Sequence, residues 1–339
     1  MSRGAVLDRL SARHRLGLGG APLGNLYAPL DEDEAQRTIA EAWRLGLRYF
    51  DTAPLYGHGL SEMRLGRFLR TQPRDSFVLS TKVGRLLVAD ANSPPERDGY
   101  VQGAAFAPHY DYSADGVLRS IEASLERLGL DRIDIAFIHD IDRHTHGDRQ
   151  PLRFREAMDG AYRALDRLRG EGVLGAIGIG VNECEVCCDA LHEGDFDCFM
   201  LAGRYTLLDT TAARELVPLC IAKGVKLILA GVYNSGILAG GAASPAHFDY
   251  RPASAAVRDR VGRIAQCCAA WDVSLPAAAL QFALACPCAS AVVVGARSAL
   301  EIAQSVERVG TVIPPGFWHA LAAEGLLDAA VLPASRQAA

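Results

Sequence analysis

The chain has 339 residues, of which 50% are hydrophobic and 22% charged, so it can bury a large core in one or two domains. Lys and Arg number 35 against 40 Asp and Glu, a net charge of −5, and no basic run indicates a nucleic-acid surface. No long apolar stretch indicates a membrane span, and residues 1–20 lack the features of a secretory signal. We therefore expect a cytoplasmic protein with neither a nucleic-acid nor a membrane partner.

Nine cysteines are an odd number, and a chain of this length needs no disulfides to be stable. We expect reduced thiols in the core. Cys184, Cys187 and Cys188 lie close enough in sequence to suggest a metal or redox site. The pattern lacks a second pair of cysteines or histidines at zinc-ligand spacing, so no metal site is predicted.

Apolar runs alternate with helical patterns along the chain. Strands are predicted at 16–20, 48–51, 77–81, 133–138, 174–179, 197–202, 225–230 and 291–294. Helices are predicted at 31–45, 61–69, 114–128, 151–170, 183–192, 210–223, within 231–285 and at 298–307. Runs of Val, Ile and Leu without polar alternation indicate a parallel sheet covered by helices, and eight such units favour a (β/α)8 TIM barrel of the α/β class. The alternative is an open doubly wound sheet, but the first strand is not followed by G-x-G-x-x-G.

The domain prediction is an N-terminal extension at 1–14, one barrel at 15–330 and a tail at 331–339. Residues 84–112 form a long irregular segment rich in proline and aromatic residues. A segment of this length is either functional or disordered, and its aromatic residues favour a loop that folds over something. Because it follows the third strand, we expect it at the mouth of the barrel, as part of the substrate site.

Three consecutive predicted strands end in titratable residues. Asp51, Lys82 and His139 end strands two, three and four, and Tyr56 lies in the loop after strand two. In a barrel these side chains face one mouth. A phenol transfers protons near neutrality only if a cation stabilises its anion, which Lys82 can do while Asp51 orients it. His139 can hold a substrate oxygen beside Tyr56.

The chain is similar to the aldo-keto reductase superfamily over about residues 15–310. The motifs that carry the resemblance are Asp51-Thr52-Ala53-x-x-Tyr56-Gly57, Ser80-Thr81-Lys82 and Ile138-His139. The resemblance implies a (β/α)8 barrel that binds a nicotinamide cofactor in extended form without a Rossmann domain. It also implies that Asp51, Tyr56, Lys82 and His139 are the catalytic tetrad.

The resemblance further implies a set of cofactor contacts. Asn182 matches the residue that binds the nicotinamide carboxamide, and residues 234–238 match the turn that binds the pyrophosphate. Glu301 stands where members that prefer NADP place a second basic residue, so NAD is predicted as the cofactor, with NADP as the alternative. The complete predicted set is Asn182, Ser235, Gly236, Leu238, Gly295, Arg297, Glu301 and Gln304.

Further motifs, among them 24–27 and 203–208, resemble the aldose 1-dehydrogenase branch, which includes L-fucose and D-threo-aldose dehydrogenases and related pyridoxal 4-dehydrogenases. This implies oxidation of the anomeric carbon of an aldose to a lactone, with Tyr56 as acid/base. The alternatives are pyridoxal oxidation, general aldehyde reduction and a non-catalytic binding subunit. Tyr27, His109 and Arg204 are the predicted substrate contacts. The partner is a small molecule, and we expect a monomer or a small homo-oligomer.

Overall fold

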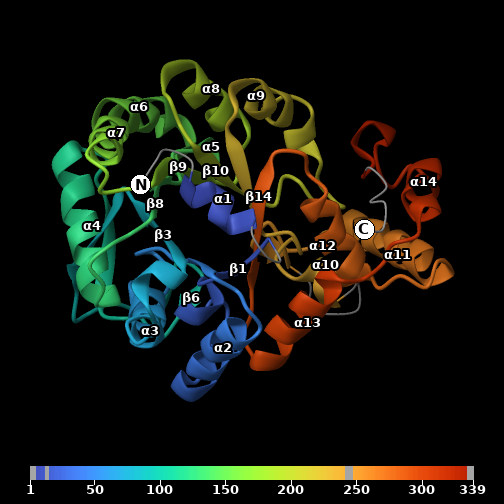
Figure 1. The fold of residues 1–339 in the computed structure, drawn as a ribbon, viewed down its shortest axis with the longest axis horizontal. Coiled ribbons are helices and arrows are strands. Elements are labelled where there is room, and N and C mark those ends of the chain that lie inside the picture. Colours follow the sequence, from blue (N-terminus) through green and yellow to red (C-terminus); the bar gives the residue numbers. More distant parts are fainter. Residues whose placement is uncertain (1–4, 12–14, 241–246, 334–339) are drawn as a thin grey trace.

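The computed structural model describes residues 5–11, 15–240 and 247–333. Eight parallel strands close into a barrel in the order β1-β14-β11-β10-β9-β8-β3-β2 (Figure 1). The strands are β1 (Leu16–Gly19), β2 (Tyr49–Asp51), β3 (Val78–Val83), β8 (Ile135–His139), β9 (Ala176–Val181), β10 (Cys198–Ala202), β11 (Lys226–Ala230) and β14 (Ala289–Gly295). The predicted TIM barrel is thus confirmed. An open sheet is excluded because the first strand pairs with the last, Leu16 lying opposite Val292.

Helices surround the barrel, and most of them follow a strand (Figure 1). They are α2 (Glu32–Arg44), α3 (Leu60–Leu69), α4 (Ala114–Leu128), α5 (Arg143–His146), α6 (Gln150–Glu156), α7 (Arg163–Gly170), α8 (Glu185–Glu193), α9 (Leu216–Lys223), α10 (Ile237–Gly240), α11 (Ala255–Ala270), α12 (Leu275–Leu284), α13 (Ala299–Val309) and α14 (Pro315–Ala323). The single helix predicted at 151–170 contains a π-helical turn, Ala157–Tyr162. There Gly160 packs so closely on the Tyr112 carbonyl that a Cβ would lie 2.4 Å from its oxygen.

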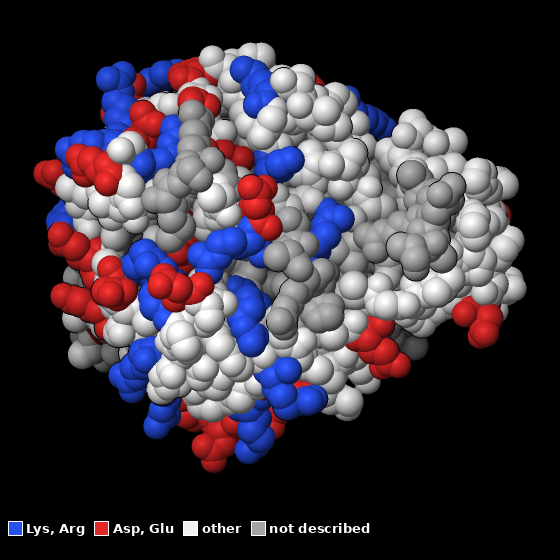
Figure 2. Space-filling model, in the orientation of Figure 1, with Lys and Arg blue, Asp and Glu red and all other residues white. Residues whose placement is uncertain are grey.

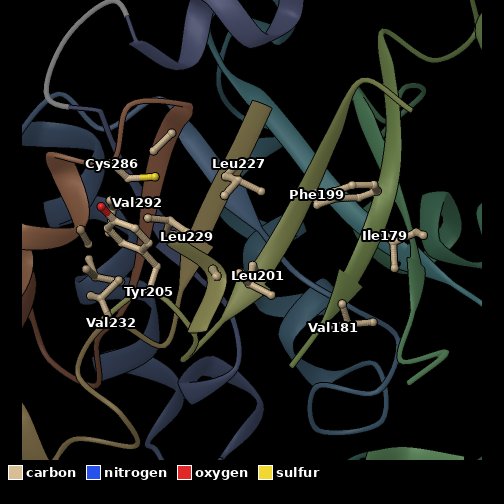
Figure 3. Close-up of a cluster of buried hydrophobic side chains, with 14 of the residues drawn as sticks. Ile179, Val181, Phe199, Leu201, Tyr205, Leu227, Leu229, Val232, Cys286 and Val292 are labelled. Carbon is tan, nitrogen blue, oxygen red and sulfur yellow. The ribbon is translucent and has the colours of Figure 1, made fainter. Parts of the chain in front are cut away.

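The strands are buried on both faces, because successive side chains point alternately toward the helices and toward the barrel axis. Figure 3 shows part of the outward set, with Ile179, Phe199, Leu201 and Leu227 belonging to the larger core cluster beneath the helices. The residues between them, such as Met200, belong to a second cluster inside the barrel. This explains why the sequence shows continuous apolar runs rather than alternation.

The N-terminal extension forms a short helix, α1 (Ala5–Ser11), that belongs to the barrel core. Val6 is fully buried, and Leu7 and Leu10 are each 5% exposed. They join Tyr49 and Val78, which lie at the amino ends of their strands, in the cluster inside the barrel. The helix therefore closes the end of the barrel opposite the catalytic mouth. Part of the predicted extension, residues 1–4 and 12–14, lies outside the described residues, as does 334–339 of the predicted tail.

The segment 84–112 is ordered, and the prediction of an irregular loop is wrong in this respect. β4 (Arg85–Ala89) and β7 (Phe106–Tyr110) pair antiparallel, and a smaller ribbon at the tip joins β5 (Glu96–Arg97) to β6 (Tyr100–Val101). We call the whole segment the hairpin. Its proline and glycine residues lie mainly in the turns, whereas its aromatic residues lie mainly on strands, which is why its composition resembles that of a loop.

A second short ribbon, β12 (His247–Phe248) with β13 (Arg251–Pro252), lies between β11 and α11 in the sequence.

Figure 2 shows acidic and basic side chains intermixed over much of one face, while the part over α11 and α14 is mostly uncharged. Among the described residues no single helix is long and apolar enough to cross a membrane. α11 and α12 have the required length and composition only when taken together, and the two helices are bent by 96° relative to each other.

We expect Val6→Asp to lower the free energy of unfolding by at least about 3 kcal/mol, because it places an unpaired charge inside the barrel. Val312→Asp is the matched control, since Val312 is 87% exposed and the change there is expected to be nearly neutral. Urea unfolding followed by circular dichroism measures both. Equal stability of the two variants would show that α1 does not hold the barrel together.

Candidate active site

A buried ion pair forms the floor of the mouth at the carboxyl ends of β2 and β3. The Lys82 ammonium donates to Asp51 Oδ2 at 2.8 Å and to the Thr52 carbonyl at 2.9 Å, and both charged residues are 2% exposed. The Ser80 hydroxyl donates to Asp51 Oδ1 at 2.7 Å. Burial raises the pKa of Asp51, while Lys82 and Ser80 oppose that rise. Every polar group of the pair therefore has a partner, as a buried charge requires.

Tyr56 stands directly above this pair. Its ring centroid lies 4.6 Å from the Lys82 Nζ, and the ring is partly buried. The loop that carries it is fixed by contact between Gly24 and Gly57, since a Cβ on Gly57 would lie 2.4 Å from the Gly24 carbonyl oxygen and Gly57 has a φ of 62°. Burial, followed by the charge of Asp51, raises the pKa of Tyr56 well above 10, so the phenol is protonated at neutral pH.

His139 ends β8 beside Tyr56, their ring centroids 6.1 Å apart in an edge-to-face arrangement. Burial, together with the charges of Arg85 and Lys82, lowers the pKa of His139 well below 6.5. The imidazole is therefore neutral at physiological pH. A neutral imidazole has one N–H, which can donate to a substrate oxygen. The structure thus brings the four predicted catalytic residues together.

The hairpin forms one wall of the mouth. Tyr100 at its tip is 5% exposed and lies 6.1 Å from Tyr56 by ring centroids. Asp98 beside it accepts from His58 at 3.0 Å, and Tyr27 N–H donates to the Gly99 carbonyl at 3.0 Å. The tip is therefore tied to the loops after β1 and β2.

His109 and Tyr27, two of the three predicted substrate residues, lie in different environments. His109 is exposed and its side chain contacts no tetrad residue, whereas its neighbour Tyr110 stacks against the Arg85 guanidinium, 5.0 Å from the ring centroid. Neighbours on a strand point to opposite faces, so Tyr110 rather than His109 faces the mouth. Tyr27 is 41% exposed and stacks on His247 at 5.1 Å, leaving part of its ring accessible.

Arg204, the third predicted substrate residue, is engaged by the protein itself. Its guanidinium lies 3.2 Å from Asp209 and 3.0 Å from Asp249, and its Nε donates to the Asn182 carbonyl at 2.6 Å. Arg204, which follows β10, is therefore tied to Asp249 on the chain between β11 and α11. Tyr250, next to Asp249, is 50% exposed, and its charge when ionised contributes to the raised pKa of Tyr56.

The residues predicted to hold the nicotinamide and the pyrophosphate lie at the ends of β9 and β11. The side-chain amide of Asn182 is partly exposed and makes no hydrogen bond to a described residue. In the turn after β11, Gly236 N–H and Leu238 N–H both donate to the Tyr233 carbonyl, at 3.0 and 3.1 Å. Ser235 N–H has no acceptor among the described residues.

The predicted adenosine end surrounds the N-terminus of α13. The Arg297 guanidinium donates to the carbonyls of the loop after β1, at 3.0 Å to Leu26, 3.1 Å to Ala28 and 2.7 Å to Pro29. Glu301 is exposed and accepts from Arg297 N–H at 2.8 Å. Gly295 ends β14, and Gln304 lies one turn into α13, where it accepts from Arg308 at 3.3 Å.

Three groups lie along one rim of the barrel: the unpaired side-chain amide of Asn182, the free N–H of Ser235 and the N-terminus of α13. These groups fit the carboxamide and the phosphates of a dinucleotide. No metal has comparable support: within the described part of the chain no three His, Cys, Asp or Glu side chains are grouped to hold an ion. All nine cysteines are free and buried.

Several residues around the tetrad were not identified from the sequence as site residues. Ser80 orients Asp51, Tyr100 walls the mouth, and the Tyr112 hydroxyl lies 2.9 Å from the His139 carbonyl. Arg85 and Asp140 form a further ion pair beside His139. Asp140 could have been identified from the sequence, because it directly follows His139. Arg85 could not, because only the pairing of the hairpin strands brings it close to His139.

The comparison with known families shows that the protein is an oxidoreductase and gives its class. The chain belongs to the aldo/keto reductase family, whose model matches residues 15–323. It is 42% identical to the pyridoxal 4-dehydrogenase of Microbacterium luteolum and 42% identical to the D-threo-aldose 1-dehydrogenase of a Pseudomonas species, in each case over 92% of this chain and 94% of the relative. Enzymes of this family use nicotinamide cofactors.

An aldo-keto reductase from Bacillus halodurans, solved in its holo form, has the same fold. It superposes with a TM-score of 0.71 over 95% of each chain at 24% identity. The predicted family is thus confirmed from the sequence and the predicted fold from the structure.

We expect the rate of substrate oxidation to rise with pH. A phenol whose pKa lies well above 10 must lose its proton before it can accept one, and the fraction ionised grows about tenfold per pH unit below the pKa. The kcat for oxidation is therefore expected to increase from pH 7 to 9, and the kcat for aldehyde reduction to fall or stay level. Steady-state rates with NAD or NADP in both directions measure this. An oxidation rate that falls over this range would contradict Tyr56 as the base.

Proposed function

We propose that this enzyme oxidises the anomeric carbon of an aldose, such as L-fucose or a D-threo-aldose, to the lactone. The observation that carries the proposal is the arrangement of a phenol, a neutral imidazole and a buried Lys–Asp pair at one mouth. The D-threo-aldose 1-dehydrogenase of Pseudomonas, 42% identical over nearly the whole chain, supports the substrate class.

The protein side of the reaction follows from the geometry. The anomeric hydroxyl lies between Tyr56 and His139, where the imidazole N–H donates to its oxygen. The ionised form of Tyr56, whose negative charge the Lys82 ammonium 4.6 Å from the ring stabilises, accepts the hydroxyl proton and becomes the neutral phenol. A bound nicotinamide supplies the hydride acceptor for C1. Asp51 holds Lys82 in place throughout.

Pyridoxal is a second candidate substrate. The pyridoxal 4-dehydrogenase of Microbacterium luteolum is equally similar in sequence, and the partly exposed ring of Tyr56 offers a surface on which a pyridine ring can stack. A panel of aldoses and pyridoxal, assayed by NAD(P)H absorbance, decides between them. Oxidation of pyridoxal alone would refute the aldose proposal.

We expect Tyr56→Phe to lower kcat at least about a hundredfold on the best substrate of that panel, because it removes the proton-transfer group and little else. Cofactor binding, followed by quenching of tryptophan fluorescence, is expected to stay within about twofold of wild type. Tyr162→Phe is the control, since Tyr162 packs on Phe196 away from the mouth. A fully active Tyr56→Phe enzyme would show that another group transfers the proton.

We also propose that the enzyme prefers NAD. The guanidinium of Arg297 is occupied by three carbonyls, and Glu301 places a carboxylate at the N-terminus of α13. Glu34 places a second one there, accepting from Ala299 N–H at 3.3 Å, although Arg37 neutralises part of its charge. The two carboxylates repel the 2′-phosphate of NADP. A carboxylate can instead accept a hydrogen bond from the free ribose 2′-hydroxyl of NAD.

The expected outcome is a kcat/KM for NAD at least about tenfold above that for NADP, since one repelled or unpaired charge changes affinity by this order. Glu301→Gln is expected to narrow the ratio, whereas Glu307→Gln, at the exposed far end of the same helix, leaves it unchanged. A wild-type preference for NADP would refute the proposal.

A further inference from the structure

A second buried ion pair lies at the mouth, and the tetrad chemistry makes no use of it. Arg85, the first residue of β4, places its Nη2 2.5 Å from Asp140 Oδ2. Their side chains are 10% and 12% exposed. The same carboxylate oxygen lies 3.3 Å from the His139 Nε2. A buried charge pair next to the catalytic imidazole is costly to desolvate, which suggests that it serves the site rather than stability.

The backbone holds Asp140 in an uncommon conformation. Its φ is 49°, in the left-handed region that a residue with a side chain rarely adopts. Asp140 N–H donates to the Gly180 carbonyl at 3.0 Å, and the Tyr112 hydroxyl lies 2.9 Å from the His139 carbonyl and 3.1 Å from that of Asp140. Such strain persists where surrounding contacts enforce it, and it is typical of functional sites.

The pair has hydrogen-bonding capacity left over. Asp140 Oδ2 accepts from Arg85, but Oδ1 accepts no hydrogen bond from a described residue. The buried Nε of Arg85 has no partner among the described residues either. Burial raises the pKa of Asp140 to about 6, so the carboxylate is largely ionised at neutral pH. The site therefore offers a free acceptor oxygen on Asp140, while Arg85 holds the other oxygen of the same carboxylate.

The geometry points to Asp140 and Arg85 as a clamp for the hydroxyl on the carbon next to the reacting carbon. This inference rests on the proposed function. Oxygens on neighbouring carbons of a sugar ring lie about one hydrogen-bond length apart. When the anomeric oxygen binds His139 Nε2, the C2 hydroxyl can thus donate to the free Oδ1 of Asp140, whose Oδ2 lies 3.3 Å from the same nitrogen and is held there by Arg85. Pyridoxal has a ring carbon without a hydroxyl at this position.

The competing interpretation is that Asp140 only orients His139. The two differ in what they predict for a substrate that lacks the C2 hydroxyl. A clamp loses its contact with such a substrate, whereas a positioning residue acts equally on all substrates. The discriminating quantity is therefore the ratio of kcat/KM for an aldose to that for its 2-deoxy counterpart, measured in wild type and in variants.

The experiment compares L-fucose, or the best aldose of the panel, with its 2-deoxy analogue and saturating NAD. In the wild-type enzyme the hydroxyl is expected to raise kcat/KM about ten- to a hundredfold, as for a hydrogen bond to a charged group. In Asp140→Asn the ratio is expected to fall below about threefold, and Arg85→Lys, which keeps the charge but holds the Asp140 carboxylate less rigidly, is expected to narrow it in part.

Asp111→Asn is the matched control. It breaks an Asp–Arg pair of 2.8 Å with Arg119 at the base of the same hairpin, outside the mouth, and is expected to leave the ratio unchanged. Reduction of 4-nitrobenzaldehyde, which has no hydroxyl, reports the tetrad alone, so dividing the sugar rates of Asp140→Asn by this rate removes any general effect of the variant on the tetrad.

Each other outcome overturns the clamp. A wild-type ratio near one refutes it without recourse to any variant, so a variant that fails to fold does not protect the proposal. If Asp140→Asn lowers kcat/KM by the same factor for the aldose, the deoxy sugar and the benzaldehyde, Asp140 is a positioning residue for His139 and not a clamp. If wild type reduces the benzaldehyde but oxidises no sugar, the proposed function fails first, and the clamp fails with it.

Discussion

The buried pair of Lys82 and Asp51 constrains the rest of the site. Two opposite charges, each 2% exposed, are tolerable inside a barrel only if the hydrogen bonds around them are complete, and Ser80 and the Thr52 carbonyl complete them. This requires β2 and β3 to pair with Asp51 opposite Ser80. A slip of one residue would turn the strand's side chains to the other face. The ion pair beneath Tyr56 therefore forms only when β2 and β3 pair in this register.

The fold and the tetrad could be predicted because their signals are local. Each strand is a continuous apolar run, and Asp51, Lys82 and His139 each stand where such a run ends. The parallel arrangement of the sheet then brings these ends together without further information. The role of α1 was missed because a short helix that fills a barrel end shows no pattern apart from a few apolar residues such as Val6 and Leu7.

The walls of the mouth could not be predicted in the same way. Tyr100, Tyr110 and Arg85 reach the site because two antiparallel strands pair across many residues, and nothing in the local sequence fixes that register. His109 was predicted as a substrate contact, whereas strand alternation turns Tyr110 rather than His109 toward the mouth. Arg204 and Arg297 illustrate a related limit. A sequence shows that a cation is present but not that carboxylates or backbone carbonyls already occupy it.

The closure of the barrel by its first and last strands affects how the protein is made. α1 leaves the ribosome before any strand of the barrel, yet the interior that covers Val6 and Leu7 is complete only when β14 pairs with β1. Contacts between residues so distant in sequence are slow to form, and the apolar helix stays uncovered while they do. The nascent chain thus exposes the apolar side chains of α1 until β14 has been made, and a chaperone that binds α1 in this interval protects it from aggregation.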